Sequence, residues 1–569
     1  MNFATPALRW AARGSTAAMI LLAVGAGAPA APASAQAATA PASTVGAAVA
    51  LASTGPAAAA TGPGANPYAP DFGHPYRHGA VPTRGAAARM RTWARQHPAA
   101  SRQVTASPAV HATSSKNLVY GGGVDGIGVT TGQEKVYLVF YGSQWGTSST
   151  DSNGNLDFTG DPSGEAPYLQ QMFKGLGTDG ELWSGVMTQY CQGVSVGAQT
   201  CPAMAAHVAY PHSVVLAGVW YDSSATAPTE ATAFQLGTEA IKAAAHFGNT
   251  TAAANRDAQY VILSPHNTHP DGFNTASGAF CAWHDYNGDP YVGVSSPFDV
   301  AFTNMPYVTD AGLSCGKDFV NSRTAGNLDG ASMVLAHEYS ETITDQNPNG
   351  GWLDSAGEEN ADKCAWLSSG SGAAADLRLA TGTFAMQGTW ANDANSGKGG
   401  CLFQHAIVST QLMRNHGFEN STIAPWRATS GVLKKKSRTY PAHSGSWLAR
   451  LGGRTAPHTD TLAQKVTLAP GSGSYGAATF SFWLRVRTND PAKKASDRLT
   501  VEVLNAAGTS VEKVLHTYSN LNATSHYVHH SFSLKSFLGQ QITLKFIGTQ
   551  TLSGHRTSFL VDDTALNAS

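Results

Sequence analysis

The segment VVLAGVWY at residues 214–221 is continuously apolar, and QYVIL at residues 259–263 has the same character. Runs of this length and composition are typical of strands that are covered on both faces of a sheet. Residues 229–247, which lie between them, have the composition and length of a helix, so the three segments predict a strand–helix–strand crossover. A further run, VYLVFY at residues 136–141, adds a strand to the predicted sheet. We therefore expect residues 116–406 to form an α/β domain with a mixed sheet.

The sequence pattern changes after His405: short segments in which apolar and polar residues alternate follow one another, with little helical pattern. Such segments are typical of an all-β sandwich. We expect this second domain to cover residues 407–569. Its predicted strands are residues 477–487, 498–504, 527–534, 541–547 and 558–563.

Length and charge limit the classes of function. A chain of 569 residues is too long for one hydrophobic core, which agrees with two folded domains. Its formal net charge of -1 and its charged fraction of 13% provide no basic field for a phosphate backbone, so we expect no nucleic-acid partner.

The amino terminus has the features of a secretory signal at residues 1–35. Arg9 and Arg13 precede an apolar stretch, and Ala33-Ser34-Ala35 forms a small-residue cleavage site. The apolar stretch is short, and no later segment provides a spanning run, so we expect no integral membrane association. The sequence predicts a secreted protein that is extracellular or associated with the cell wall.

Residues 36–115 are rich in Ala, Pro, Thr and Gly and lack the apolar periodicity of a buried face. We expect this segment to be mobile in isolation. Its second half is basic, and residues 86–96 have helix-forming composition. Two interpretations remain open, a removable pro-segment and a flexible wall-spanning linker.

The chain has an even number of cysteines, all in the predicted α/β domain, and an exported protein favours disulfides over metal thiolates. No pair has the close C-x-x-C form of a structural zinc site. Pairing in sequential order is the simplest expectation, although spacing alone allows about fifteen connectivities. The cysteines are Cys191, Cys201, Cys281, Cys315, Cys364 and Cys401.

The segment LAHEYSE at residues 335–341 carries the sharpest chemical signal. It lies in a predicted helix that begins at Asp329, as N-cap, and that Pro348 and the following glycines must end. On this helix His337 and Glu341 are one turn apart on the same face, where they can bind one zinc ion. Glu338 lies about a hundred degrees around the axis. It is the candidate general base that deprotonates a metal-activated water.

Zinc in a hydrolytic site needs a third protein ligand. Glu359 is the first choice, whereas Asp362 would orient His337 through its other ring nitrogen, and these two roles can be exchanged. H-E-x-x-E differs from the usual H-E-x-x-H, so a purely structural role for the acidic residues is the alternative. His269, His284 and Tyr307 are candidates to stabilise the transition state, with their position relative to Glu338 left open.

Residues 280–401 contain FCAWHDY, FTNMPYVTDAGLSCG, HEYSETITDQNPNGGWLDSAGEENADKCAW and KGGC. This run resembles a family of secreted microbial metallopeptidase-like proteins and is distantly similar to plant EXORDIUM/phosphate-induced proteins. The resemblance implies an extracellular location and a zincin-like site on His337, Glu338, Glu341, Glu359 and Asp362. It implies no particular substrate.

The tail contains NHGFEN, AHSGSWLARLGG and TSFLVDD, and resembles the jelly-roll modules that are appended to many secreted peptidases and glycan-active enzymes. The resemblance implies binding to an extracellular polysaccharide. Glu419 with Asp562 or Asp563 could hold a structural Ca²⁺. Trp426 and Trp447 are candidates to stack on sugars, whereas Trp483 is expected in the core.

These observations together predict a secreted zinc peptidase that acts on a protein or peptide. One alternative is a non-catalytic, EXORDIUM-like wall-associated protein that keeps the acidic helix for folding or for Ca²⁺. Another is a glycan-binding protein that acts through the C-terminal sandwich.

Overall fold

A computed structural model describes residues 65–98, 116–212, 214–276, 278–469, 475–491, 493–551 and 555–569. The predicted signal peptide, residues 1–35, lies outside the described residues. None of the helices in the described part of the chain has the length and apolar character that a bilayer crossing requires.

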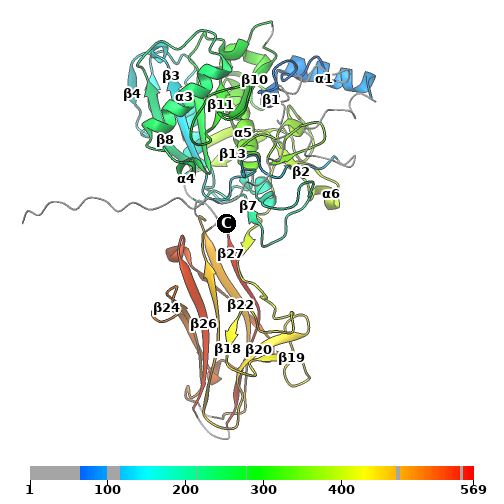
Figure 1. The fold of residues 1–569 in the computed structure, drawn as a ribbon, viewed down its shortest axis with the longest axis vertical. Coiled ribbons are helices and arrows are strands. Elements are labelled where there is room, and N and C mark those ends of the chain that lie inside the picture. Colours follow the sequence, from blue (N-terminus) through cyan, green and yellow to red (C-terminus); the bar gives the residue numbers. More distant parts are fainter. Residues whose placement is uncertain are drawn as a thin grey trace, which may run out of the picture. The chain divides into compact units, whose positions relative to one another are not determined.

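The central sheet has the strand order β1-β10-β11-β9-β3-β8 (Figure 1). Strands β11, β9, β3 and β8 run parallel, while β10 is antiparallel to β11 and β1 is antiparallel to β10. The sheet is therefore mixed, with β1 at one edge. The strands are β1 (His78–Pro82), β3 (Lys135–Tyr141), β8 (Leu216–Asp222), β9 (Ala258–Leu263), β10 (Phe280–Tyr286) and β11 (Ala301–Met305).

Helices cover both faces of this sheet. On β9 the Gln259 amide donates to Thr342 of α5, whereas the adjacent Tyr260 hydroxyl donates to Asn255 on the opposite face. Helix α3 packs on the Tyr260 face, where Gly237 approaches Phe302, the β11 partner of Tyr260. The helices are α1 (Arg84–Gln96), α2 (Glu165–Gly175), α3 (Ala233–His246), α4 (Ala252–Asn255), α5 (Asp329–Thr344) and α6 (Ala394–Gly397).

Residues 168–190 have the composition and length of one long helix, but the structure divides them. Helix α2 ends at Gly175, and Gly177 then adopts a left-handed backbone with φ 78°, which no α-helix can continue through. A separate 3₁₀ helix follows at Ser184–Gln189. The predicted crossover helix at residues 229–247 corresponds to α3.

Short two-stranded sheets and disulfides surround the central sheet. The cysteines pair in sequential order, as predicted: Cys191–Cys201, Cys281–Cys315 and Cys364–Cys401. The second disulfide joins β10 to the 3₁₀ segment Val308–Cys315, which packs on α5. The short strands are β2 (Val119–Tyr120), β4 (Ser148–Thr150), β5 (Leu156–Phe158), β6 (Cys191–Gln192), β7 (Ala206–His207), β12 (Trp352–Leu353), β13 (Ala375–Leu379), β14 (Gly382–Met386), β15 (Thr389–Ala391) and β16 (Gly400–Leu402).

Part of the segment that we expected to be mobile is folded. Residues 65–98 contain β1 and α1, and the predicted helix at residues 86–96 lies within α1. Thr83 caps α1 by accepting a hydrogen bond from the Ala86 amide. Arg77 forms a buried ion pair with Asp271, with 2.7 Å between Nε and Oδ2. Composition alone missed this order because the contacts come from distant parts of the chain.

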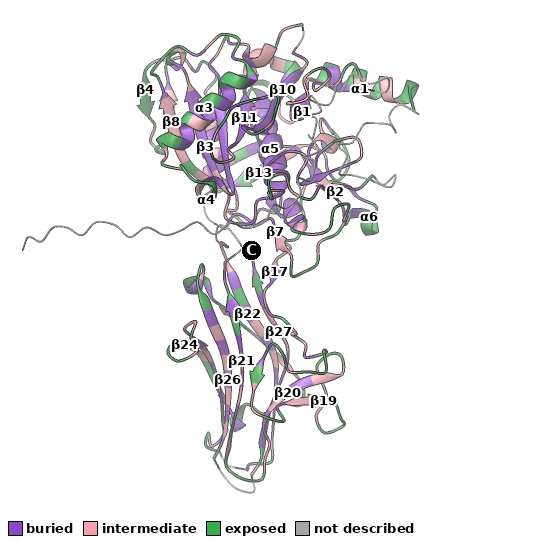
Figure 2. Ribbon diagram, viewed as in Figure 1, coloured by how far each residue is buried: buried purple, intermediate pink, exposed green. Residues whose placement is uncertain are grey.

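From β17 onward the strands pair antiparallel in two sheets, ordered β19-β20-β27-β22-β25 and β18-β21-β26-β23-β24, with β17 paired to β27. Burial alternates along these strands (Figure 2), so one face of each sheet builds a shared core. This is the predicted β-sandwich. The strands are β17 (Thr410–Gln411), β18 (Arg427–Ala428), β19 (Leu433–Lys435), β20 (Trp447–Gly452), β21 (His458–Thr467), β22 (Ala478–Thr488), β23 (Arg498–Leu504), β24 (Val511–Ser519), β25 (Val528–Ser533), β26 (Gln541–Gln550) and β27 (Thr557–Ala568).

Candidate metal centre

Helix α5 is buried along its whole length, as Figure 2 shows, so its polar residues lie inside the protein. The predicted N-cap is wrong: Leu328 occupies that position, and Asp329 lies in the first turn. The Asp329 carboxylate instead accepts hydrogen bonds from the amides of Val320 and Asn321. After Thr344 the chain leaves the helix at Asp345, whose carboxylate accepts from the amides that follow.

The predicted one-turn pair is present. Nε2 of His337 lies 3.1 Å from Oε1 of Glu341 and 3.5 Å from Oδ1 of Asp362. The side chains of His337 and Glu341 are fully buried, whereas Asp362 is 16% exposed. Donor atoms at this spacing can share one cation, since ligands about 2.1 Å from zinc lie roughly 3 to 3.5 Å from each other.

The other nitrogen of His337 is held by Gln387. Nδ1 of His337 lies 3.2 Å from Oε1 of Gln387, and the Gln387 amide nitrogen donates to the carbonyl of Ala361. The amide therefore presents its oxygen to the ring, so Nδ1 carries a proton and donates it. In the neutral ring Nε2 then keeps its lone pair, which faces two carboxylates. The predicted orienting role for Asp362 thus belongs to Gln387.

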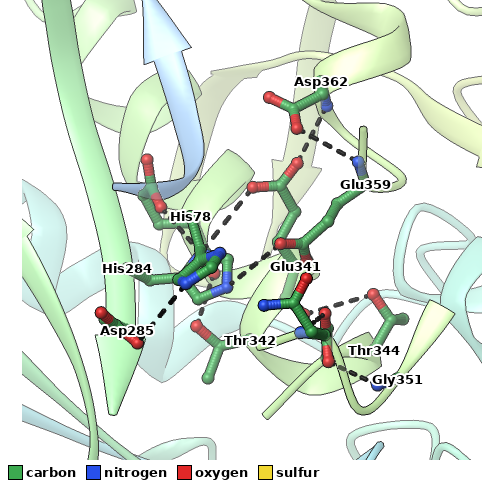
Figure 3. Close-up of polar contacts among 12 residues, drawn as sticks. His78, His284, Asp285, Glu341, Thr342, Thr344, Gly351, Glu359 and Asp362 are labelled. Carbon is green, nitrogen blue, oxygen red and sulfur yellow. Dashed lines mark hydrogen bonds and ion pairs between the residues drawn. The ribbon is translucent and has the colours of Figure 1, made fainter. Parts of the chain in front are cut away.

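A second group lies on the other side of Glu341. His284 comes from β10, and its Nδ1 lies 3.2 Å from Oε2 of Glu338 and 3.8 Å from Oε2 of Glu341. Its Nε2 lies 3.6 Å from Oε1 of Glu359. Figure 3 shows the side chains of His284, Glu341 and Glu359 turned toward one another. Glu341 therefore joins the two groups, with one oxygen directed to each histidine.

Several buried polar atoms at this place lack a hydrogen-bond partner among the described residues. They are Nε2 of His284, Nε2 of His337, Oε2 of Glu341 and Oε2 of Glu359. Buried polar atoms are nearly always paired, and clustered carboxylates repel one another. Two sets of donor atoms lie close enough together to share a cation, namely His337, Glu341 and Asp362, and His284, Glu338 and Glu341, so the residues present fit a metal ion.

The ionisation of these groups reflects the same crowding. Burial raises the pKa of Glu341 to about 8, with the Asp362 charge adding to the effect. Burial also raises the pKa of Glu338 and of Glu359 well above the ordinary value. Burial opposes a charge on His337, but Glu341 and Asp362 outweigh it and raise the pKa of this histidine. The protein thus gathers acidic groups around two imidazoles at a place where burial disfavours their charged forms.

The structure brings His284, Glu338, Glu359 and Asp362 together around Glu341. Asp362, rather than Glu359, lies beside His337, which fits the exchanged assignment of these two residues better than our first choice, and metal binding by either residue stays a prediction. His269 and Tyr307 bond elsewhere.

Nδ1 of His269 contacts the carbonyl of Phe273, and the Tyr307 hydroxyl donates to Asp161. Gln387 was missed, because a glutamine 50 residues from the motif carries no sequence signal.

In the sandwich the predicted calcium residues surround one turn. The Glu419 carboxylate accepts from the amides of Ser446 and Trp447. The Asp562 carboxylate accepts from the amide of His443, and Asp563 contacts the ring of His443. Ca²⁺ binding by these residues stays a prediction.

The tryptophans of the sandwich differ from expectation. Trp426 is 2% exposed and packs on Phe418, so it cannot stack on a sugar without unfolding the core. Trp483 is not in the core: it is partly exposed on β22 and stacks on His443, with ring centroids 3.9 Å apart. Strand alternation directs its neighbours Phe482 and Leu484 inward instead.

No protein-family model matches this chain, and no curated protein matches it. The resemblance to metallopeptidase-like and EXORDIUM proteins therefore rests on the sequence motifs alone.

Solved structures with similarity include carbohydrate-binding modules. TmCBM61 in complex with β-1,4-galactotriose has 17% identity and a TM-score of 0.22, over 28% of this chain and 100% of that chain. The CBM22-1 xylan-binding domain from Paenibacillus barcinonensis has 16% identity and a TM-score of 0.19, over 28% and 95%. A Family 16 Carbohydrate Binding Module-2 has 18% identity and a TM-score of 0.19, over 27% and 98%.

Proposed function

We propose that this protein is a secreted zinc-dependent hydrolase with a zincin-like site, and that its substrate is a protein or peptide. The observation that carries the proposal is the environment of His337. Its Nδ1 is committed to Gln387, while its buried Nε2 faces the carboxylates of Glu341 at 3.1 Å and Asp362 at 3.5 Å. This is the arrangement in which a supporting residue fixes the tautomer of a metal-ligating histidine.

His337, Glu341 and Asp362 would hold the ion. When bound, zinc lowers the pKa of a water molecule and polarises the carbonyl that is attacked. Asp362 is the one of the three side chains with measurable exposure, so substrate and water would reach the site from its side. Glu359 is directed toward His284 and is the remaining acidic residue beside the proposed site.

Glu338 is the proposed general base. Its carboxylate lies next to the ligand row, and its Oε2 is within hydrogen-bonding distance of Nδ1 of His284. His284 would hold the carboxylate in place while Glu338 takes a proton from water and later returns it to the leaving amine. Burial raises the pKa of Glu338, which makes its carboxylate a stronger base toward the proton of water.

The test compares the full-length wild type with Glu338→Gln. We expect zinc content near one ion per chain in both proteins, and hydrolysis of labelled casein to fall at least 100-fold in the variant, as is typical for loss of a general base. Glu230→Gln, at an exposed position, is the control for loss of one charge.

Zinc binding without hydrolysis in the wild type would contradict the proposal and favour the non-catalytic alternative. Two ions per chain would indicate that His284, Glu338 and Glu341 form a second metal site.

A second candidate function belongs to the sandwich. Trp483 stacks on His443, and Tyr527 and His529 lie beside these rings. We call these four rings the aromatic platform: Trp483 and His443 are stacked, the other two rings are tilted or edge-on to them, and aromatic rings of this kind can contact sugar rings. We therefore propose that the sandwich binds an extracellular polysaccharide.

Sedimentation of the full-length protein with insoluble xylan, cellulose and peptidoglycan tests this second proposal. Trp483→Ala should reduce the bound fraction at least tenfold for the polymer that binds, because an exposed aromatic ring dominates such contacts. Tyr291→Ala, outside the sandwich, is the matched control. Equal binding by Trp483→Ala would contradict the aromatic platform.

A further inference from the structure

The edge strand β1 lies directly over the candidate metal centre. It pairs antiparallel with β10, and His78 is the partner of His284 in this pairing. Without β1, β10 would be the edge of the sheet, and its unpaired backbone would lie beside Glu338 and Glu341. The residues of β1 belong to a segment that is separated from the rest of the domain by residues 99–115.

The backbone of β1 fills the space next to the catalytic groups. A Cβ atom at Gly79 would lie 2.1 Å from Oε2 of Glu341 and 2.5 Å from Cε1 of His284, so no other residue fits there without displacement. Gly79 also has φ +52°, which favours glycine. Two residues on, the backbone amide of Val81 contacts Glu338, where it opposes the rise in pKa that burial causes. Strand β1 therefore covers Glu338, the proposed general base.

Specific contacts hold this strand in place. Arg77 is 4% exposed and, besides its ion pair with Asp271, donates to the carbonyls of Pro70 and Asp271. At the other end, the indole of Trp366 donates to the carbonyl of Pro82 at 2.7 Å. Nε2 of His78 lies 3.6 Å from Asp289 and 4.0 Å from Asp285. These anchors lie on both sides of Gly79.

We propose that residues 77–97 are an autoinhibitory segment, in which β1 occupies the edge of β10 where an extended polypeptide substrate pairs. This inference rests on the proposed hydrolase function and deepens it, because it names both the regulation and the form of the substrate. An exposed strand edge recognises the backbone of an added strand through alternating amides and carbonyls. The edge of β10 can pair with one strand at a time, so β1 and the substrate exclude each other.

Gly79 brings the backbone of β1 into close contact with the candidate metal centre. Glycine within a strand weakens it, so this close approach has a cost in strand stability. Here a glycine lies at the one position where a side chain would collide with Glu341 and His284. The strand is thus fitted to the metal centre and not only to its neighbour β10.

The experiment uses the full-length protein and two ways of loosening β1. Arg77→Ala removes the buried anchor, and Gly79→Val introduces a side chain that the centre cannot accommodate. Arg91→Ala, an exposed position on α1, is the matched control. We measure amide hydrogen exchange in residues 280–286, the rate at which a chelator removes zinc, and hydrolysis of labelled casein.

We expect both variants to increase exchange in β10 and zinc removal at least tenfold, with a rise in casein hydrolysis of similar size. Arg91→Ala should match the wild type in all three measurements. If Arg77→Ala proves unfolded by circular dichroism, Gly79→Val alone decides, since it leaves the Arg77 anchor intact.

Two results would overturn the inference. Unchanged exchange in β10 in a folded Gly79→Val protein would show that β1 does not protect the edge. The second result is faster exchange in β10 with the same casein hydrolysis as in the wild type, provided that Glu338→Gln abolishes that hydrolysis. It would show that the protein is a hydrolase whose activity β1 does not restrain. Zinc-loaded protein that lacks hydrolysis in every variant would instead refute the proposed function, and with it this regulation.

Discussion

Acidic side chains are buried both around helix α5 and on strand β27, but the two regions differ in the hydrogen-bond donors that these carboxylates find. Around α5 the carboxylates of Glu341 and Glu359 each keep one oxygen without a hydrogen bond among the described residues. In the sandwich, Asp562 is also fully buried, yet its oxygens accept hydrogen bonds from the amides of His443 and Asp563. The satisfied carboxylate stabilises a turn, whereas the unsatisfied ones are the basis on which we propose a cation site.

Removal of the central imidazole should give the largest effect. In His337→Ala, zinc affinity should fall more than 100-fold, beyond the 10- to 100-fold that is typical for a residue that only supports a ligand. Competition with a chelator of known affinity measures the change. His246→Ala, exposed on α3, should leave zinc affinity unaltered. If His337→Ala bound zinc as tightly as the wild type, His337 would not be a zinc ligand.

Loss of the supporting amide should have an intermediate effect. Gln387→Leu deprives Nδ1 of His337 of its acceptor, so zinc affinity should fall roughly 10- to 100-fold. Gln387→Glu keeps an acceptor oxygen and should recover most of the affinity. The same chelator competition applies, and a Leu variant with wild-type affinity would show that the tautomer of His337 is set in another way.

The metal-free protein should show the cost of the unsatisfied carboxylates through its pH dependence. The pKa of Glu341 is about 8 when folded and near 4.5 in the unfolded chain, so between these values the unfolded state loses its proton first. This group therefore reduces stability progressively as pH rises from about 4.5 to 8.

Glu341→Gln should remove that contribution, which is on the order of 4 kcal/mol by pH 8. Urea unfolding of metal-free protein at pH 5 and pH 8 measures it. Added zinc should stabilise the wild type but not this variant. A variant that loses stability with pH as steeply as the wild type would contradict the assignment.

The sandwich should show the smallest change. Asp562→Asn keeps one acceptor oxygen for the 443–444 turn, so we expect a loss of less than about 1 kcal/mol and no response to zinc. Thermal unfolding with and without zinc tests both parts. If Ca²⁺ stabilises the wild type but not Asp562→Asn, the predicted calcium site is supported.

Prediction from the sequence was most accurate where the signal is local. The strands at residues 136–141, 259–263 and 498–504 and the helix around His337 follow from runs of apolar residues or from one-turn spacing. Strands β21 and β24 were missed, because His458–Thr467 is largely polar and Val511–Ser519 is mostly exposed. A strand that pairs at an edge or carries polar residues does not stand out in composition.

The sequence by itself determined that the chain has an α/β region followed by a sandwich, that its cysteines can pair, and that His337 and Glu341 share one face of a helix. These properties depend on residues that are close together in the chain. Only the tertiary structure decided that Asp362, Gln387, His284 and Gly79 surround that helix face. The reason is physical: their proximity results from packing between strands and loops far apart in sequence, and the desolvation that makes their charges costly exists only once the core has closed.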